Sequence, residues 1–270
     1  MTIQLEIIEE LRRLTQHEYV DLTLSGDAAI EAALLLCSPG QRLLIPEEGG
    51  WLSYEKLSKK RSLACVKVKC DQAKINLVDL RANISGSAAF LYQNPGGYFA
   101  RQFMKEIYEL CHAARCLVIM DVSGALGTEL CDGRYADVMV GSFGKWKLVE
   151  AQGGGFISSS NIDYQCTVTK NMATPAEEQL PIIRNALGQL SQRIEFLLEK
   201  REKILLDLKS YDIMHKNDLG FVVVVKYHSE EEREKIVTYC QEEKLPFTEC
   251  PRYIRLMERA ISIEVKKLQE

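Results

Sequence analysis

The chain of 270 residues lacks any apolar run long enough to span a membrane. Its N-terminus, Met-Thr-Ile-Gln-Leu-Glu, has neither the basic start nor the apolar block of a signal peptide. The net charge of −4 is not accompanied by any basic cluster, which argues against nucleic-acid binding. We therefore expect a cytoplasmic protein without membrane or nucleic-acid partners.

Metal-binding and disulfide patterns are also missing. No two of the nine cysteines have the two-residue spacing of a zinc knuckle. Their odd number argues against a complete disulfide framework, and most lie in apolar surroundings, as buried thiols do. The sequence predicts no metal site, and it contains no internal repeat or low-complexity segment.

The composition, 46% hydrophobic and 27% charged, is typical of an α/β protein with a large core. Short apolar runs predict strands at residues 20–24, 43–46, 64–69, 87–92, 116–121, 138–140, 219–227 and 253–256. Apolar residues at helical spacing, or turns opening into helix-forming residues, predict helices at 4–16, from residue 27 onward, and at 77–84, 101–115, 176–210 and 229–244. This order suggests one large domain and one small one, joined by the helix at 176–210.

The segment after the predicted strand at 138–140 contains the most candidate catalytic and binding side chains. A polar turn there presents Ser142, Lys145 and Lys147 before the run Gly153-Gly154-Gly155. A lysine at the end of a buried strand can be partly desolvated, which lowers its pKa and frees the amine to form a Schiff base with a carbonyl compound. Ser142 could bind a phosphate. The alternative is a surface hairpin with two solvated lysines.

Two further strand ends carry candidate ligand groups. Ser25-Gly26-Asp27 opens a helix, so its backbone N–H groups could bind an anion, although an ordinary capped helix is the alternative. Asp27 would cap the helix but repel a phosphate. Asp121 ends a buried strand, where a carboxylate is costly unless it has a cationic partner; a structural N-cap is the alternative.

Together these segments resemble a known family. Ser142-Phe143, a lysine five positions after the serine and the glycine cluster resemble the cofactor-lysine segment of pyridoxal 5′-phosphate (PLP) enzymes of fold type I. The match is closest to the DegT-like sugar aminotransferase and cysteine desulfurase branches, and it points to Lys147. Counting from Asp137 as class V aminotransferases space it would favour Lys145. The helix start at Ser25 and the Asp121-Val-Ser-Gly segment are similar to class V segments as well, so the resemblance covers about residues 20–160.

The resemblance implies a three-layer fold, in which a mostly parallel sheet has helices on both faces and is followed by a small C-terminal α+β domain. We place the large domain at residues 1–175 and the linking helix with the small domain at 176–270. The resemblance also implies that Asp121 pairs with the protonated pyridine nitrogen of PLP, which makes the ring a better electron sink. Ser25, Gly26 and Ser142 would hold the phosphate.

Four more residues have roles that are implied by the resemblance or suggested by their place in a predicted strand or turn. Trp51 would stack on the ring, or else anchor the core. Asn94 would bond the phenolic oxygen of the cofactor, or else form a turn with Pro95. Thr174 would reach the phosphate of a partner subunit in a homodimer with shared sites, or else cap a helix. Arg255 could bind a substrate carboxylate, or else lie solvated on a strand.

The predicted function is that of a PLP-dependent enzyme acting on an amino acid or another amino compound through a lysine Schiff base, foremost an aminotransferase. A lyase or a desulfurase would use the same apparatus, although no cysteine lies in the serine-rich loop that desulfurases use. A different class of function is a relative that has lost catalysis and serves as a binding subunit, which Asp27 and the short ends of the chain would suggest.

Overall fold

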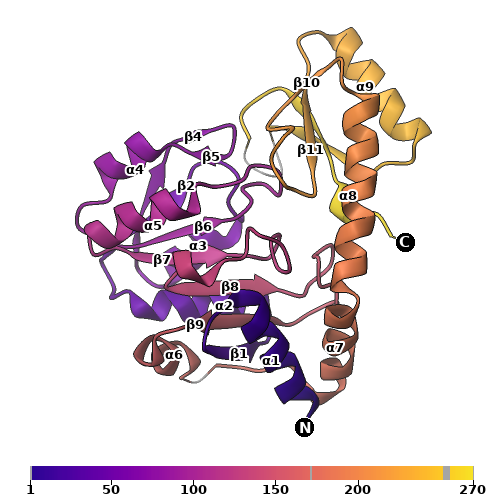
Figure 1. Cartoon of the computed structure of the whole chain (residues 1–270). Helices are drawn as coiled ribbons and strands as arrows, with labels where there is room; N and C mark the ends of the chain where they lie inside the picture. Colours follow the sequence, from indigo (N-terminus) through magenta and orange to yellow (C-terminus); the bar gives the residue numbers. More distant parts are fainter. Residues whose placement is uncertain (1, 171, 252–255, 270) are drawn as a thin grey trace.

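The computed structural model describes residues 2–170, 172–251 and 256–269. Its first two thirds form a seven-stranded sheet with helices on both sides (Figure 1). The strands of this sheet are β1 Tyr19–Thr23, β2 Arg42–Pro46, β3 Ala64–Val68, β6 Ser87–Gln93, β7 Leu117–Asp121, β8 Val138–Ser142 and β9 Gly155–Ser159. The helices around it are α1 Ile3–Thr15, α2 Gly26–Ala33, α3 Ser53–Lys60, α4 Leu77–Asn83, α5 Met104–Ala113 and α6 Ile162–Thr169. A small hairpin, β4 Cys70–Asp71 and β5 Lys74–Ile75, follows β3.

The strand order is β1-β9-β8-β7-β6-β2-β3. All neighbours from β3 to β8 pair in parallel, whereas β9 runs antiparallel to both β8 and β1. The carboxyl ends of β2, β6, β7 and β8 therefore meet at one edge, where open α/β sheets bind their ligands. The prediction of a mostly parallel sheet is confirmed.

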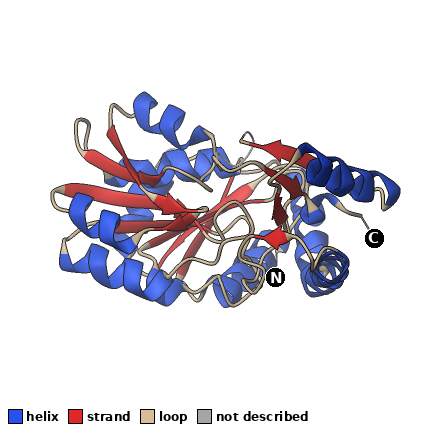
Figure 2. Cartoon of the chain, turned by 90° about the horizontal axis from the view of Figure 1, so that it is seen from above, coloured by secondary structure: helices blue, strands red, loops and turns tan. Residues whose placement is uncertain are grey.

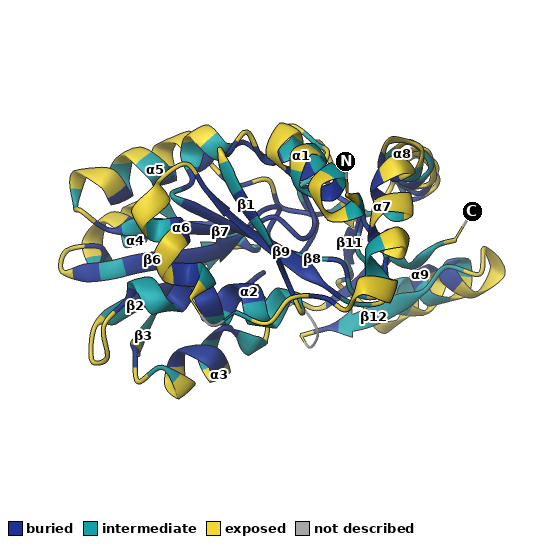
Figure 3. Cartoon of the chain, turned by 90° about the horizontal axis from the view of Figure 1, so that it is seen from below, coloured by how far each residue is buried: buried dark blue, intermediate teal, exposed yellow. Residues whose placement is uncertain are grey.

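Helices lie on both faces of the large sheet (Figure 2). Side chains that alternate between these two faces build two cores. In β6, Phe90 and Tyr92 pack with α1, α4 and α5, whereas Ala89 and Leu91 pack with α2, α3 and α6. The central strands are buried on both faces and the helices are exposed only on their outer sides (Figure 3). This is the three-layer arrangement that the resemblance implies.

The C-terminal part is built around a four-stranded antiparallel sheet in the order β10-β11-β13-β12. Its elements are α7 Leu180–Gly188, α8 Leu190–Asp207, β10 Asp212–Ile213, β11 Val223–Lys226, α9 Glu230–Glu242, β12 Phe247–Cys250, β13 Ala260–Ile263 and the 3₁₀ turn η4 Val265–Lys267. Helix α8 connects the two sheets along one side of the molecule (Figure 1). The predicted α+β domain is thus present, while its boundary after residue 175 stays a prediction.

Two expectations for this part were wrong or fall outside the description. The predicted single helix at 176–210 is divided, because a 3₁₀ turn at Glu177–Gln179 precedes α7 and the helix breaks again at Gln189. Gly188 ends α7, and glycine weakens a helix because its backbone has the most freedom to lose. The strand predicted at 253–256 lies mostly outside the described residues, and β13 was not predicted.

A backbone hydrogen bond ties the C-terminal part to the loop that follows β6, and a second one extends the connection to η4. The Phe221 N–H donates to the Tyr98 carbonyl at 2.7 Å, and the Lys266 N–H donates to the Phe221 carbonyl at 2.9 Å. These bonds bring η4 beside the loop that follows β6. Among the helices of the described part, none is long and apolar enough to cross a membrane.

Candidate active site

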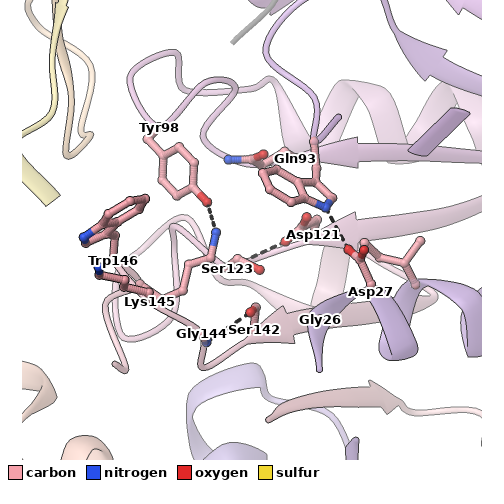
Figure 4. Close-up of a pocket in the computed structure, with 13 residues that line it drawn as sticks. Gly26, Asp27, Gln93, Tyr98, Asp121, Ser123, Ser142, Gly144, Lys145 and Trp146 are labelled. Atoms are coloured by element: carbon pink, nitrogen blue, oxygen red, sulfur yellow. Dashed lines mark hydrogen bonds between the residues drawn. The ribbon is translucent and has the colours of Figure 1, made fainter. Parts of the chain in front are cut away.

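A cavity of about 320 Å³ opens at the carboxyl edge of the large sheet. Labelled side chains from separate segments converge on it in Figure 4. Its lining consists of Gly26, Asp27, Ile30, Trp51, Gln93, Tyr98, Asp121, Ser123, Ser142, Gly144, Lys145, Trp146 and Lys147. Six of the residues predicted as site residues therefore share one cavity of the size of a small-molecule site: Gly26, Asp27, Trp51, Asp121, Ser142 and Lys147.

The loop that carries both lysines is closed by backbone hydrogen bonds at its base. The Phe143 N–H donates to the Gly154 carbonyl at 3.0 Å, and the Ala151 N–H donates to the Phe143 carbonyl at 2.8 Å. Between the lysines, Trp146 adopts a left-handed backbone with φ of 65°. Non-glycine residues in this region are uncommon and cluster at functional sites, because the surrounding structure must hold them there.

The two lysines have different surroundings. Lys145 is exposed, and its Nζ lies 4.7 Å from the centre of the Trp146 ring. Lys147 is half-buried, and its Nζ lies 5.4 Å from the Trp51 ring and 5.0 Å from the Tyr98 ring. The geometry favours Lys147 as the more desolvated amine, and the assignment stays a prediction.

Tyr98 contacts Lys147 directly, and no pattern in the sequence indicated it. The Lys147 ammonium donates a hydrogen bond to the Tyr98 hydroxyl oxygen. Burial raises the pKa of Tyr98, and the Lys147 charge opposes this. The ring has room only because residue 124 is glycine, since a Cβ at Gly124 would lie 2.5 Å from a ring carbon of Tyr98.

Asp121 lies at the floor of the cavity and is only 4% exposed. One carboxylate oxygen accepts from the Tyr54 hydroxyl at 2.9 Å, and the other accepts from the Ser123 N–H at 3.0 Å. Burial, and then the Asp121 charge, raise the pKa of Tyr54, so this phenol remains a hydrogen-bond donor. Within the described part of the chain, no lysine, arginine or histidine forms an ion pair with Asp121.

The start of α2 provides backbone N–H groups at the cavity wall. The Ser25 hydroxyl accepts from the Ala28 N–H at 3.1 Å, so this side chain caps the helix rather than lining the cavity. A Cβ at Gly26 would lie 2.6 Å from the Ser142 Cβ, so only glycine lets α2 approach β8 this closely. The Ser142 hydroxyl oxygen accepts from the Gly144 N–H at 3.2 Å.

The Asp27 carboxylate is engaged by an indole. The Trp51 Nε1–H donates to an Asp27 oxygen at 2.7 Å. This bond partly satisfies the carboxylate that was expected to repel a phosphate, and it fixes one edge of the Trp51 ring. Trp51 therefore lines the cavity in a defined orientation.

At the end of β6 the cavity is lined by Gln93 and not by Asn94. Asn94 is fully buried, its amide group donates to the Leu130 carbonyl at 2.9 Å, and its carbonyl oxygen accepts from the Gln102 N–H at 3.1 Å. Gln93 is 4% exposed, and its Nε2 has no hydrogen-bond partner among the described residues. The alternation of the strand turns Gln93 to the cavity, so Gln93 is a second candidate for this contact, and the cofactor contact of Asn94 stays a prediction.

The two remaining candidates do not line the cavity. Thr174 is exposed, and the neighbouring Ala173 carbonyl accepts from the Leu24 N–H at 3.0 Å, close in sequence to the start of α2. Arg255 lies outside the described residues. Both roles stay predictions. Tyr54, Gln93, Tyr98 and Ser123 were missed.

Comparisons with known proteins match this fold. Residues 189–270 match the model of the MJ1341 family C-terminal domain. A DegT DnrJ EryC1 StrS aminotransferase from Brucella abortus superposes with a TM-score of 0.80 at 14% identity, covering 100% of this chain and 87% of that one. This chain has the fold of the PLP-dependent transferases of fold type I.

Two more solved structures agree. 3-Amino-5-hydroxybenzoic acid synthase gives a TM-score of 0.79 at 14% identity, covering 98% of this chain and 85% of that one. NtdA from Bacillus subtilis with bound PMP gives a TM-score of 0.78 at 15% identity, covering 98% of this chain and 72% of that one. No curated protein matches the sequence. At these identities the likeness establishes the fold.

Proposed function

We propose that this protein is a PLP-dependent enzyme that acts on an amino compound, foremost as an aminotransferase. The observation that carries the proposal is Asp121, a buried carboxylate without a cationic partner in the described chain, at the floor of a cavity that also holds the Lys147 amine. A buried carboxylate is costly unless a cation offsets it. The protonated pyridine nitrogen of PLP would be that cation.

The residues present fit this cofactor. Gln93 Nε2 is a buried donor without a partner and would bond an oxygen of the ring. The N–H groups at the start of α2, together with Ser142, would hold the phosphate, because the positive end of a helix dipole favours an anion. Trp51 would cover the ring, and Lys147 would attach the cofactor covalently. Ser25 would act indirectly, by capping α2.

When bound, the cofactor would supply an electron sink for the bonds at the α-carbon of the amino compound. The chain contributes the proton chemistry. The Lys147 amine is the base that removes and returns a proton, and the Tyr98 hydroxyl holds this amine in place. Asp121 is held by Tyr54 and Ser123, so its carboxylate does not turn away from the cavity.

Lys147→Ala and Lys145→Ala, compared with the parent chain, test the assignment. After incubation with PLP and reduction with borohydride, mass spectrometry of the peptides should find the cofactor on Lys147 in the parent and in K145A. It should find no fixed cofactor in K147A. A parent chain that stays colourless and unlabelled would overturn the proposal and favour the non-catalytic alternative, and labelling retained in K147A but lost in K145A would move the role to Lys145.

The aminotransferase activity and the homodimer belong to the same proposal. Several of the solved structures with this fold are named aminotransferases and one is a cysteine desulfurase, so transfer of an amino group is the first activity to test. Thr174 is exposed beside a segment that also exposes Leu24, at 53%, which suits an approach by a second copy. Spectral change on mixing with single amino donors tests the activity, and the mass of the protein in solution tests the dimer.

A further inference from the structure

A buried ion pair from the C-terminal part lies against the candidate site. The Glu264 side chain is 0% exposed and the Lys266 side chain 2% exposed, and the Lys266 ammonium donates to the Glu264 carboxylate. The other Glu264 oxygen accepts from the Ser262 hydroxyl at 3.0 Å. Lys267 approaches the same carboxylate to 3.8 Å. Neither Glu264 nor Lys266 belongs to the cavity lining.

The backbone around this pair is fixed from several elements. The Glu264 N–H donates to the Pro246 carbonyl at 2.7 Å, and the Lys266 N–H donates to the Phe221 carbonyl at 2.9 Å. The Arg193 guanidinium donates to the Lys266 carbonyl at 3.1 Å. A buried ion pair is weak evidence for stability, because the desolvation of two charges offsets their attraction. The position of this ion pair relative to other groups is therefore a better guide to its role than its contribution to stability.

The pair faces Tyr98. The Lys266 Nζ lies 4.7 Å from the centre of the Tyr98 ring, and the Lys147 Nζ lies 5.0 Å from the centre of the same ring. The Tyr98 hydroxyl accepts from Lys147, while the Tyr98 carbonyl is bonded by Phe221 of the C-terminal part. One aromatic ring thus contacts two amines that come from opposite parts of the chain.

We propose that Lys266 is a positioning residue for Lys147. Its positive charge, held against the Tyr98 ring, disfavours the ammonium form of Lys147 and so keeps a larger fraction of that amine neutral and reactive. The inference rests on the proposed function in so far as Lys147 is the reactive amine. Two like charges that share a ring in a half-buried site repel each other, and this favours loss of a proton from one of them.

Other charges face the two amines and set the size of this effect. Around Lys147, Lys145 lies in the same loop, Asp121 comes from β7 and Asp27 comes from α2. Beside Lys266, the negative charge of Glu264 is offset in part by the positive charge of Lys267. Burial lowers the pKa of Lys266 to about 8; Glu264 opposes this change, and the charge on Lys147 adds to it. Lys266 is therefore charged at neutral pH, where its repulsion is present, and this repulsion fades as the pH rises through about 8.

The test measures the reactivity of Lys147 as a function of pH in the full chain, after any bound aldehyde has been removed by dialysis against cysteine. The protein is pulsed with acetic anhydride at each pH, and the acetylated fraction of the Lys147 peptide is measured by mass spectrometry. Lys266→Gln removes the charge but keeps a donor for Glu264, whereas Lys266→Arg keeps the charge. Lys105→Gln, on the exposed face of α5, is the matched control for loss of a lysine charge.

We expect the acetylated fraction of Lys147 at neutral pH, where Lys266 is charged, to fall roughly threefold to tenfold in K266Q. It should stay at the parent value in K266R and K105Q. A merely structural role for Lys266 would lower the melting temperature without changing this fraction. A fraction in folded K266Q equal to that of the parent overturns the inference, and Lys266→Met carries the same test if K266Q does not fold.

Failure of this inference differs from failure of the proposed function. The labelling profile is measured without PLP, so it reports the interaction between the two amines whether or not the chain binds the cofactor. If PLP does not bind but K266Q labels less at neutral pH than the parent, the interaction stands and the proposed function fails. If PLP binds and K266Q labels like the parent, the proposed function stands and the interaction fails.

Discussion

Two buried carboxylates near the cavity are satisfied in different ways. Glu264 in the C-terminal part is paired with Lys266, approached by Lys267 and bonded by Ser262. Asp121 in the large sheet accepts hydrogen bonds from Tyr54 and Ser123 and has no cationic partner in the described chain. The negative charge of Glu264 is offset by lysines of the same chain, whereas that of Asp121 could be offset by a cationic ligand in the cavity.

This difference separates a carboxylate that holds the fold together from one that awaits a ligand. Removing one partner of a buried ion pair leaves an uncompensated charge and is strongly destabilising. Replacing a buried carboxylate that has no cation by a neutral amide removes such a charge instead. The two acids should therefore respond unequally to the same chemical change.

The largest effect is expected on activity. Asp121→Asn should reduce the rate of amino-group transfer on the order of a thousandfold, because an amide cannot hold the pyridine nitrogen protonated. Glu129→Gln, which changes an exposed acid away from the cavity, is the control and should leave the rate unchanged. Rates are measured with the amino donor that gives the largest spectral change. A D121N rate within tenfold of the parent would remove Asp121 from the mechanism.

The next effect concerns folding. Glu264→Gln should lower the free energy of unfolding by about 3 kcal/mol, because it leaves the Lys266 ammonium buried without its anion. Asp121→Asn should change the same quantity by less than about 1 kcal/mol. Urea unfolding of both variants without PLP gives the comparison. Equal losses in the two variants would show that both acids serve the fold alike.

A smaller effect separates the two amides at the end of β6. Gln93→Leu should weaken PLP binding about tenfold and leave stability nearly unchanged, because the Gln93 Nε2 has no partner to lose in the described chain. Asn94→Leu should instead destabilise the fold by about 2 kcal/mol, because it breaks the bonds to Leu130 and Gln102. PLP titration and urea unfolding of both variants test this pair. The opposite pattern would return the cofactor contact to Asn94.

The smallest effect is a pH dependence. Burial lowers the folded pKa of Lys266 to about 8 from 10.5, so between these values the unfolded chain binds more protons. Stability from this group therefore rises with pH, as the buried ammonium loses its proton. Between pH 7.5 and pH 9, the unfolding free energy of the parent should gain about 1 kcal/mol relative to that of Lys266→Met. A constant difference across this range would show that Lys266 is not a buried, titrating amine.

Much of the fold followed from local patterns. The apolar run at 116–121 and the helix-forming segments at 77–84 and 229–244 were recovered as β7, α4 and α9, because a buried strand or an amphipathic helix needs those residues wherever it packs. The break at Gln189 was missed, since the periodicity of apolar residues continues across it. Gly188 was the one local signal for it, because glycine weakens a helix.

The candidate site was predicted where it depends on strand ends and missed where it depends on long-range packing. Asp121 and Lys147 follow apolar strands, and a strand end has a local signature. Gln93 could have been found, because it lies two residues after Leu91 and therefore on the same face of β6. Leu91 packs on the α2 side of the sheet. Tyr98 could not, since its place depends on the missing side chain at Gly124 and on a bond from Phe221.

Both tryptophans of the chain, Trp51 and Trp146, line the same cavity. The tryptophan emission of the protein therefore comes from this one location. A small molecule that enters should quench or shift that emission. The molecule thus contains its own optical reporter, and unlabelled protein can be screened against candidate amino donors in a cuvette.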